Sequence, residues 1–195
     1  MKEKGQSSRK RCFNGIMLII ALMVIAGCES ETQKPKDFDS AVEGPQLIVE
    51  PDVIRLGVAK LVGTEIIFRG KGFDPDEKIM VVLSGNEEEN REVNIPIGFG
   101  KTDENGLFKA IVEKREKIFN ILRADVNFGE KGASIVIMGP PIPAGTYTAE
   151  AFGYNSEKKA TCQLTFNKPT VMDKTKDWLG SLLGKIEYEE GVSMQ

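Results

Sequence analysis

Histidine is absent from this sequence of 195 residues, which also contains only three cysteines and one tryptophan. Histidine is the commonest general base and zinc ligand in proteins, so most hydrolase and zinc-enzyme mechanisms lose their central residue. The sequence has no phosphate-binding loop or dinucleotide fingerprint, and Ser181 in "LGSLLG" does not fit a nucleophile elbow. We therefore expect a protein that is not an enzyme and that needs no cofactor or metal.

The charges are distributed unevenly along the chain. Five of the 26 basic residues but only one of the 29 acidic residues lie in the first 27 positions, so the remainder carries a net charge of -7. A body of this charge is repelled by phosphate backbones. We therefore expect no nucleic acid partner.

The amino-terminal segment has the three parts of an export signal. Residues 1–11 are basic, residues 13–26 are almost wholly apolar, and small residues precede Cys28. The apolar run is shorter than the roughly 20 residues that a membrane-spanning helix needs. The run Ile25-Ala26-Gly27-Cys28 resembles the lipobox of bacterial lipoproteins.

This resemblance implies that residues 1–27 are a signal peptide, cut between Gly27 and Cys28, and that Cys28 is acylated. Two or three acyl chains anchor a protein stably to a membrane. The alternative is an ordinary cleaved signal, or an uncleaved anchor, with an incidental cysteine. Because Glu29 and not aspartate follows the cysteine, the resemblance favours the outer membrane in a Gram-negative organism. In other bacteria we expect export to the cell surface.

Residues 28–44 have the composition of a flexible tether, polar and charged with one proline. The part after Cys28 can span at most about 50 Å when fully extended. Cys162 is the only thiol left once Cys12 leaves with the signal and Cys28 is acylated. We therefore expect Cys162 to be a buried core thiol without a disulfide partner.

Residues 45–167 contain short segments in which apolar and polar residues alternate, bounded by Gly, Pro, Asn and Asp. The expected inward-facing sets are Ile66 and Phe68; Tyr147, Ala149 and Ala151; and Ala160, Cys162, Leu164 and Phe166. The segment "KIMVVLSG" is more continuously apolar, which is typical of a strand covered on both faces. These segments predict an antiparallel β-sandwich.

Five motifs within this region resemble, in their order, the bacterial immunoglobulin-like domains of surface and secreted proteins. They are "VEPDVIRLG", "IIFRGKGFDPDEKIMVVL", "KTDENGLFKAIV", "IPAGTYTAEAFG" and "ATCQLTF". The resemblance implies a mainly β, antiparallel immunoglobulin-like sandwich with a binding or spacing role, and it names no ligand. Tyr147 is expected to be a corner tyrosine, with a buried ring and a hydroxyl bonded to the backbone.

An insertion at about residues 113–141 interrupts the motif order. Ile118, Ile121, Leu122 and Val126 have the spacing of one face of a short helix. The insertion is either a partner-binding element, with Ile118, Ile121 and Leu122 as contact candidates, or a cover for one open end of the sandwich.

Residues 168–195 are predicted to form a C-terminal amphipathic helix and tail. Thr170 and Asp173 resemble a capping pair. Apolar spacing continues through Val171, Thr175, Trp178, Leu179, Leu182 and Ile186. This face can pack back on the sandwich, dock on a partner or lie on lipid, and Trp178, Leu179 and Leu182 are the contact candidates.

Two loops are rich in acidic residues. Asp74, Asp76 and Glu77 crowd one loop, and Asp103 and Glu104 crowd the other. Carboxylates suit calcium, but an EF-hand spacing is missing and turn residues explain both loops. We therefore expect structural turns and no metal site.

The sequence as a whole predicts a membrane-anchored bacterial lipoprotein that displays a non-catalytic immunoglobulin-like domain. The expected role is binding another envelope protein, or serving as an accessory subunit of an envelope assembly. One alternative is a carbohydrate or peptidoglycan binding module, which would need exposed aromatic platforms. The other is a structural spacer, which would leave no exposed apolar patch.

Overall fold

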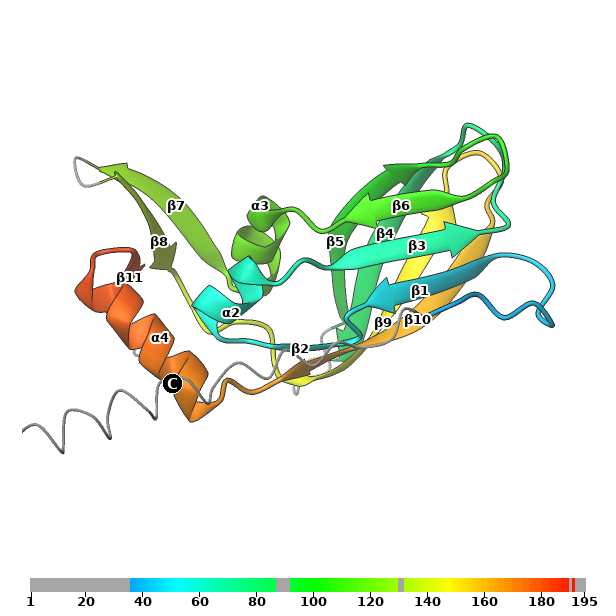
Figure 1. Ribbon diagram of the computed structural model, residues 1–195. Coiled ribbons are helices and arrows are strands. Elements are labelled where there is room, and N and C mark those ends of the chain that lie inside the picture. Colours follow the sequence, from blue (N-terminus) through cyan, green and yellow to red (C-terminus); the bar gives the residue numbers. More distant parts are fainter. Residues whose placement is uncertain (1–35, 87–91, 130–131, 190, 192–195) are drawn as a thin grey trace, which may run out of the picture. The chain divides into compact units, whose positions relative to one another are not determined.

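The computed structural model describes residues 36–86, 92–129, 132–189 and 191. The predicted signal peptide, Cys28 and the first part of the tether lie outside these residues. The described residues form three β-sheets, two of which face each other as a sandwich (Figure 1). None of the described helices combines the length and the apolar character needed to cross a bilayer.

The sandwich consists of a smaller sheet with strand order β1-β3-β6 and a larger sheet with order β2-β10-β9-β4-β5. Neighbouring strands are antiparallel except β2, which runs parallel to β10. The strands are β1 (Gln46–Glu50), β2 (Val53–Arg55), β3 (Ile67–Lys71), β4 (Lys78–Asn86), β5 (Glu92–Lys101), β6 (Phe108–Ile111), β9 (Gly145–Gly153) and β10 (Lys159–Asn167). The prediction of a mainly β, antiparallel immunoglobulin-like sandwich is confirmed.

The core between the two sheets follows the alternation in the sequence. The predicted inward-facing residues that are buried are Ile66, Phe68, Tyr147, Ala149, Ala151, Ala160, Leu164 and Phe166, and Cys162 is half-buried. Strand β4 departs from the expectation of two covered faces, because Met80 and Val82 are only half-buried while Ile79, Val81 and Leu83 are buried. Its alternate residues therefore face outward.

Tyr147 is the predicted corner tyrosine. Its side chain is buried, and its hydroxyl donates a hydrogen bond to the carbonyl oxygen of Pro143 at 2.9 Å. The ring packs edge-on against Phe166, with centroids 5.6 Å apart. A buried ring with its hydroxyl bonded to upstream backbone is the tyrosine corner of immunoglobulin-like folds.

The remaining elements form what we call the annex, which Figure 1 shows at one end of the sandwich. They are α2 (Val58–Gly63), α3 (Lys114–Glu116), the π-helix η2 (Lys117–Ile121), β7 (Ala124–Gly129), β8 (Gly132–Ile137), α4 (Val171–Leu182) and β11 (Ile186–Tyr188). Strands β7 and β8 are an antiparallel hairpin, and β11 pairs parallel to β8. The insertion and the tail, far apart in sequence, thus fold together.

Two sequence-based details of the annex are wrong. Val126 lies on β7 and not on a helix, because the helical part of the insertion ends at Ile121. Ile186 lies on β11 and not on the C-terminal helix. The helix ends earlier because Gly184 takes a positive φ of 65°, a conformation that glycine adopts without strain and that stops helix propagation.

Candidate functional site

Helix α4 is attached to the annex by two aspartates on its inner face. Asp173 and Asp177, one helical turn apart, are 2% and 6% exposed. The two carboxylate oxygens of Asp177 accept hydrogen bonds from the backbone N–H groups of Val58 at 2.9 Å and Ala59 at 2.8 Å. These N–H groups begin α2 and have no partner within that helix. Asp177 therefore caps α2 from a distant part of the chain.

Asp173 anchors the first turn of α4. Its carboxylate accepts hydrogen bonds from the backbone N–H and the hydroxyl of Thr170, at 3.0 and 2.7 Å, and completes the predicted capping box. The Nε atom of Arg55 lies 3.0 Å from the same oxygen. Burial opposes ionisation of Asp173, but the Thr170 hydrogen bonds and the Arg55 charge lower its pKa below the usual value.

Two glycines let α4 approach its neighbours closely. A Cβ atom at Gly57 would lie 2.8 Å from the Cβ of Asp173, and one at Gly180 would lie 2.8 Å from the Cδ1 of Ile186. Both distances are shorter than real Cβ contacts. The buried side of α4 is therefore made of paired carboxylates and a glycine.

The opposite side of α4 is apolar and exposed. We define the α4 apolar face as Val171, Met172, Trp178, Leu179, Leu182 and Leu183, whose side chains are between 44% and 83% exposed. The alternative in which this face packs back on the sandwich therefore does not apply to these residues. The candidates Trp178, Leu179 and Leu182 remain available for an external contact.

The exposed charges of α4 are all positive. Within α4, which the structure describes completely, the solvent-exposed charged residues are Lys174 and Lys176, since both aspartates point inward. Lys168 precedes the helix, Lys185 follows it, and both are also exposed. The surface that α4 presents is therefore apolar with a basic border.

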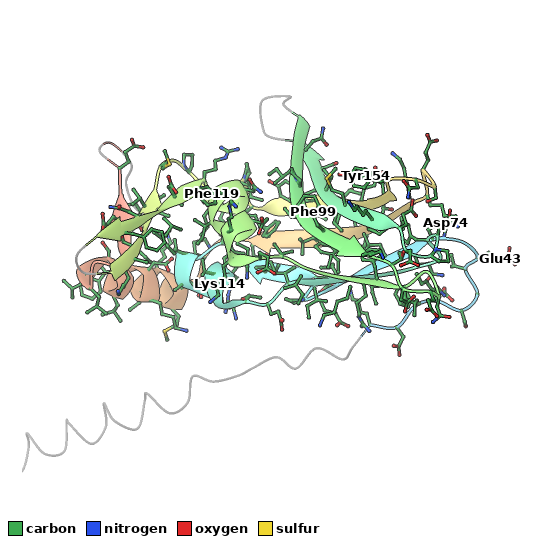
Figure 2. All side chains as sticks on the ribbon, turned by 90° about the horizontal axis from the view of Figure 1, so that it is seen from above. Glu43, Asp74, Phe99, Lys114, Phe119 and Tyr154 are labelled. Carbon is green, nitrogen blue, oxygen red and sulfur yellow. The ribbon has the colours of Figure 1, made fainter. Side chains whose placement is uncertain are left out.

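The insertion candidates Ile118, Ile121 and Leu122 are 6%, 0% and 1% exposed and belong to the core. Their assignment as partner contacts is therefore corrected, because side chains packed in the core cannot reach a partner. The exposed apolar residues of the insertion include Phe119, labelled in Figure 2, and Phe128. The guanidinium of Arg115 lies 5.6 Å from the centre of the Phe119 ring.

Lys117 links the insertion to α2. Its side chain is 3% exposed, and its Nζ donates hydrogen bonds to the carbonyl oxygens of Thr64 at 2.7 Å and Val62 at 3.4 Å. Burial, together with the nearby charge of Lys114, lowers the pKa of Lys117. The tail thus caps the start of α2 with a carboxylate, and the insertion caps its end with an amine.

A second apolar surface lies on the outer face of the larger sheet. We define the sheet-face cluster as Met80, Phe99, Phe152 and Tyr154. Met80 stands opposite Phe99 on β5 and opposite Phe152 on β9, so the three side chains share one face. The Tyr154 hydroxyl lies 3.6 Å from the sulfur of Met80, and the Tyr154 and Phe152 ring centres are 5.6 Å apart.

Phe99 and Tyr154, both labelled in Figure 2, are the most accessible members of this cluster, at 59% and 55% exposed. Among the large aromatic residues, the sequence suggests only Tyr154 and Trp178 as exposed platforms. Phe99 was not predicted to be exposed, because the local sequence "GFG" does not show which face of the sheet the side chain occupies until the register between β4 and β5 is known.

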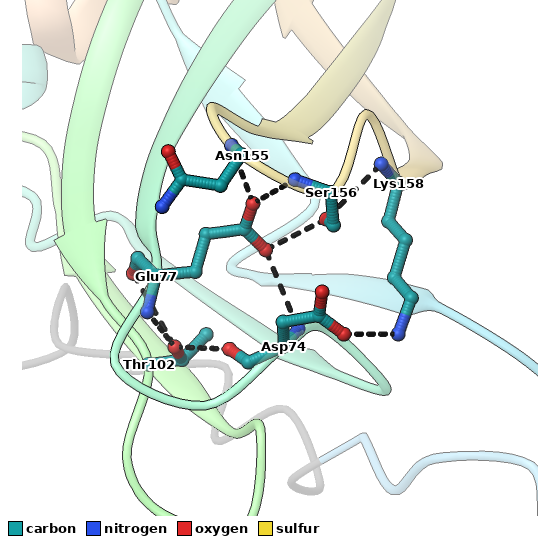
Figure 3. Close-up of polar contacts among 6 residues, drawn as sticks. All are labelled: Asp74, Glu77, Thr102, Asn155, Ser156 and Lys158. Carbon is teal, nitrogen blue, oxygen red and sulfur yellow. Dashed lines mark hydrogen bonds and ion pairs between the residues drawn. The ribbon is translucent and has the colours of Figure 1, made fainter.

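The acidic loop after β3 is organised around one buried carboxylate (Figure 3). Glu77 is 1% exposed and accepts hydrogen bonds from the backbone N–H groups of Asn155 at 2.7 Å and Ser156 at 2.6 Å. The Ser156 hydroxyl at 2.8 Å and the Asp74 N–H at 3.3 Å add two more. Burial opposes ionisation, but these hydrogen bonds lower the pKa of Glu77.

The neighbouring carboxylates are also occupied by protein groups. Asp74 pairs with Lys158 at 2.7 Å, and Asp76 pairs with Lys101 at 2.6 Å. Asp103 accepts hydrogen bonds from two backbone N–H groups of its own turn. Among the described residues no group of three or more potential metal ligands occurs. Both acidic loops therefore serve as turns.

Cys162 lies on β10 with its side chain partly buried. Burial raises the pKa of the thiol to about 12, and the charge of Lys36 only partly offsets this. The thiolate, which is the reactive form, is therefore not populated near neutral pH.

The tether is shorter than the sequence suggested. From Lys36 onward the chain is fixed to the sandwich: Lys36 forms an ion pair with Asp52, and its carbonyl accepts a hydrogen bond from Arg69 at 2.8 Å. Gln46 donates a further hydrogen bond to the carbonyl of Asp39 at 2.7 Å. Polar side chains of β1 and β3 thus hold residues that have a linker composition.

Comparisons with known proteins establish neither a family nor a function. No family model and no curated protein matches the sequence. A β-glucosidase from Listeria innocua in complex with glucose is 13% identical with a TM-score of 0.35, covering 63% of this chain and 16% of that chain. A second structure of that enzyme is 12% identical with a TM-score of 0.36, covering 74% and 20%.

The structure of BslA, described as a bacterial hydrophobin, is also similar. It is 11% identical with a TM-score of 0.32, and the match covers 66% of this chain and 98% of BslA. At these identities and TM-scores the likenesses carry no argument about the fold, activity or partners of this chain.

Proposed function

We propose that this chain is a lipid-anchored lipoprotein of the bacterial envelope whose immunoglobulin-like domain binds another envelope protein without catalysis. The lipobox-like run ending at Cys28 supports the anchor. The sheet-face cluster carries the binding part of the proposal. Four neighbouring methionine and aromatic side chains lie on one face of the sheet, two of them exposed and two half-buried, which is the composition of protein interface centres.

Polar residues border this cluster on β9 and β10. Lys159 stands opposite Phe152 and forms an ion pair with Glu150 at 3.0 Å, and Gln163 donates a hydrogen bond to Thr148 at 3.3 Å. An apolar centre with a polar rim is the usual anatomy of a specific interface. The Phe152 and Tyr154 rings are tilted by 48° to each other, so the two rings together do not form one continuous flat platform.

The binding proposal is tested by placing a photo-crosslinking residue at Tyr154 in intact cells. We expect an adduct with a defined envelope protein that disappears when Phe99→Ser is added. Leu107→Ser, which changes an exposed apolar residue outside the cluster, is the matched control and should keep the adduct. Loss of the adduct in both variants, no adduct at all, or retention of the purified protein on peptidoglycan would overturn the proposal.

The anchor is tested separately by metabolic labelling with palmitate. We expect label in the wild type and none in Cys28→Ala. Equal labelling of the two proteins would rule out Cys28 as the acylated residue.

A further inference from the structure

The α4 apolar face has the character of a helix that lies in a membrane interface. Such helices carry Trp and Leu on one side and lysines along the border, and they lie parallel to the bilayer surface. The buried side of α4 is attached by the hydrogen bonds and the ion pair of Asp173 and Asp177 and by the close approach at Gly180. The apolar side chains are therefore not needed to hold the helix. Trp178 is 52% exposed, and tryptophan prefers the interface between head groups and acyl chains.

The border of this face suits an anionic surface. Lys174 and Lys176 on the helix and Lys168 before it are exposed, whereas the segment after the helix carries exposed Lys185, Glu187 and Glu189 together. The chain after position 27 has a net charge of -7 even with these lysines included, so the basic border of the helix is a local feature. Anionic lipid head groups attract juxtamembrane lysines, and salt weakens the attraction.

The short segment between Cys28 and the domain limits how far α4 can lie from the proposed membrane anchor. Seven residues lie between Cys28 and Lys36, so the Cα atoms of these two residues are at most about 28 Å apart. Lys36 pairs with Asp52, directly before β2, and Arg55 at the end of β2 contacts Asp173 on α4. The point at which the chain joins the domain and the start of α4 therefore lie along the same short strand.

We propose that the α4 apolar face lies on an anionic phospholipid bilayer and holds the domain against the membrane to which Cys28 anchors it. This inference rests on the proposed lipid anchor for its setting, but not for the binding itself. The lipid acts as the second contact of a two-point attachment, in which the acyl chains raise the local concentration of the helix near the bilayer.

The binding is tested with the unacylated chain starting at residue 29. Residues from Pro35 onward form one compact unit with the core inside it, so this chain retains the fold. Trp178 is the only tryptophan, and its emission reports on the proposed surface directly. With phosphatidylglycerol vesicles at low salt we expect a blue shift and quenching by brominated acyl chains. Phosphatidylcholine vesicles or added salt should weaken both signals.

Matched variants separate the apolar and the basic contributions. Leu182→Ser should weaken vesicle binding by more than about tenfold, whereas Phe99→Ser on the sheet face should not change it. Replacing Lys174 and Lys176 by Gln should weaken binding to phosphatidylglycerol by about tenfold or more. Lys109→Gln, an exposed lysine on β6, is the charge control and should have little effect.

Three outcomes would overturn the inference. The first is an unchanged emission spectrum with phosphatidylglycerol vesicles. The second is a concentration-dependent shift without vesicles, which would identify a second copy of the chain as the occupant. The third is a photo-crosslink from Leu182 of the full chain in cells that yields a protein adduct and no lipid adduct. Because vesicle binding is measured without acyl chains, failure of palmitate labelling and failure of this inference are distinguishable.

Discussion

The sandwich and the annex are stabilised in different ways. The sandwich buries the apolar side of each alternating strand, as for Phe68, Leu83 and Leu164, all 0% exposed. The annex also contributes apolar residues such as Leu61 and Ile121 to the core, but α2 is in addition fixed at both ends by charged side chains. Asp177 binds the start of α2, and Lys117 binds its end. The buried side of an amphipathic helix is therefore not necessarily its apolar side when the polar side chains have fixed backbone partners.

This difference has a functional consequence. Because Asp173 and Asp177 hold α4, its apolar side chains are left for an external surface. In the sandwich, by contrast, the apolar side chain of Phe99 is exposed because its strand has an uncovered outer face. The two external surfaces of the molecule thus have separate structural origins.

The largest expected effect concerns a buried carboxylate of the sandwich, and it tests how much a charged side chain outside the annex contributes to stability. Glu77→Ala leaves the N–H groups of Asn155 and Ser156 without their acceptor, so we expect a loss of about 3 kcal/mol in the free energy of unfolding. Denaturant unfolding at pH 7 measures it. A loss comparable to that of an exposed control, Glu104→Ala, would show that the network contributes little.

The pH dependence of the same residue sharpens this test. The folded state lowers the pKa of Glu77 from 4.5, so its stabilising contribution is complete above pH 4.5 and is lost as the pH falls through the folded-state pKa. Glu77→Gln cannot titrate. We therefore expect the wild type to lose more stability than this variant between pH 7 and acid pH. Parallel pH profiles would contradict this.

The next largest effect is expected in the annex. Asp177→Ala removes both capping hydrogen bonds of α2 and should cost about 2 kcal/mol. Hydrogen exchange should accelerate in α2, α4 and β11 and stay slow in β4 and β9. Lys174→Ala, in the same helix but exposed, is the matched control. Equal acceleration in the sandwich would show that the two regions unfold as one cooperative unit, which would break the comparison.

The same contrast explains what the sequence could predict. Strand geometry allows only two faces, so alternation at Ile66, Tyr147 and Leu164 determined which side is buried. A helical pattern at Trp178 and Leu182 shows only that one face is apolar, and not where that face points. The orientation of α4 depends on a capping contact with Val58, 119 residues away.

Cross-strand register limited the prediction in the sandwich as well. The sheet-face cluster exists because β5 places Phe99 opposite Met80 and β9 places Phe152 opposite the same residue. No local pattern contains this information. In the insertion, the apolar helical spacing of Ile118 and Ile121 fits a core segment as well as it fits a binding element. The structure places both residues in the core.

A smaller effect is expected at the corner tyrosine. Tyr147→Phe removes the hydroxyl bonded to Pro143 and keeps the buried ring, so the loss should be about 1 kcal/mol. Tyr154→Phe removes an exposed hydroxyl that lies 3.6 Å from the thioether sulfur of Met80, so it should change stability less. A larger loss at Tyr154 would mean that the sheet-face cluster is a structural element and would weaken its role as a contact surface.

The smallest effect on stability is expected on the α4 apolar face, and it is the most informative one for the comparison of the sandwich with the annex. Leu182→Ser should change the free energy of unfolding by no more than about 0.5 kcal/mol, because the side chain is exposed. Ile186→Ala, four residues further on but buried, should cost about 3 kcal/mol. If Leu182 adds nothing to folding but is required for vesicle binding, then the residues that hold α4 on the domain differ from the residues that contact the membrane. A large loss at Leu182 would instead show that the apolar face packs within the molecule, and the membrane contact would fall with it.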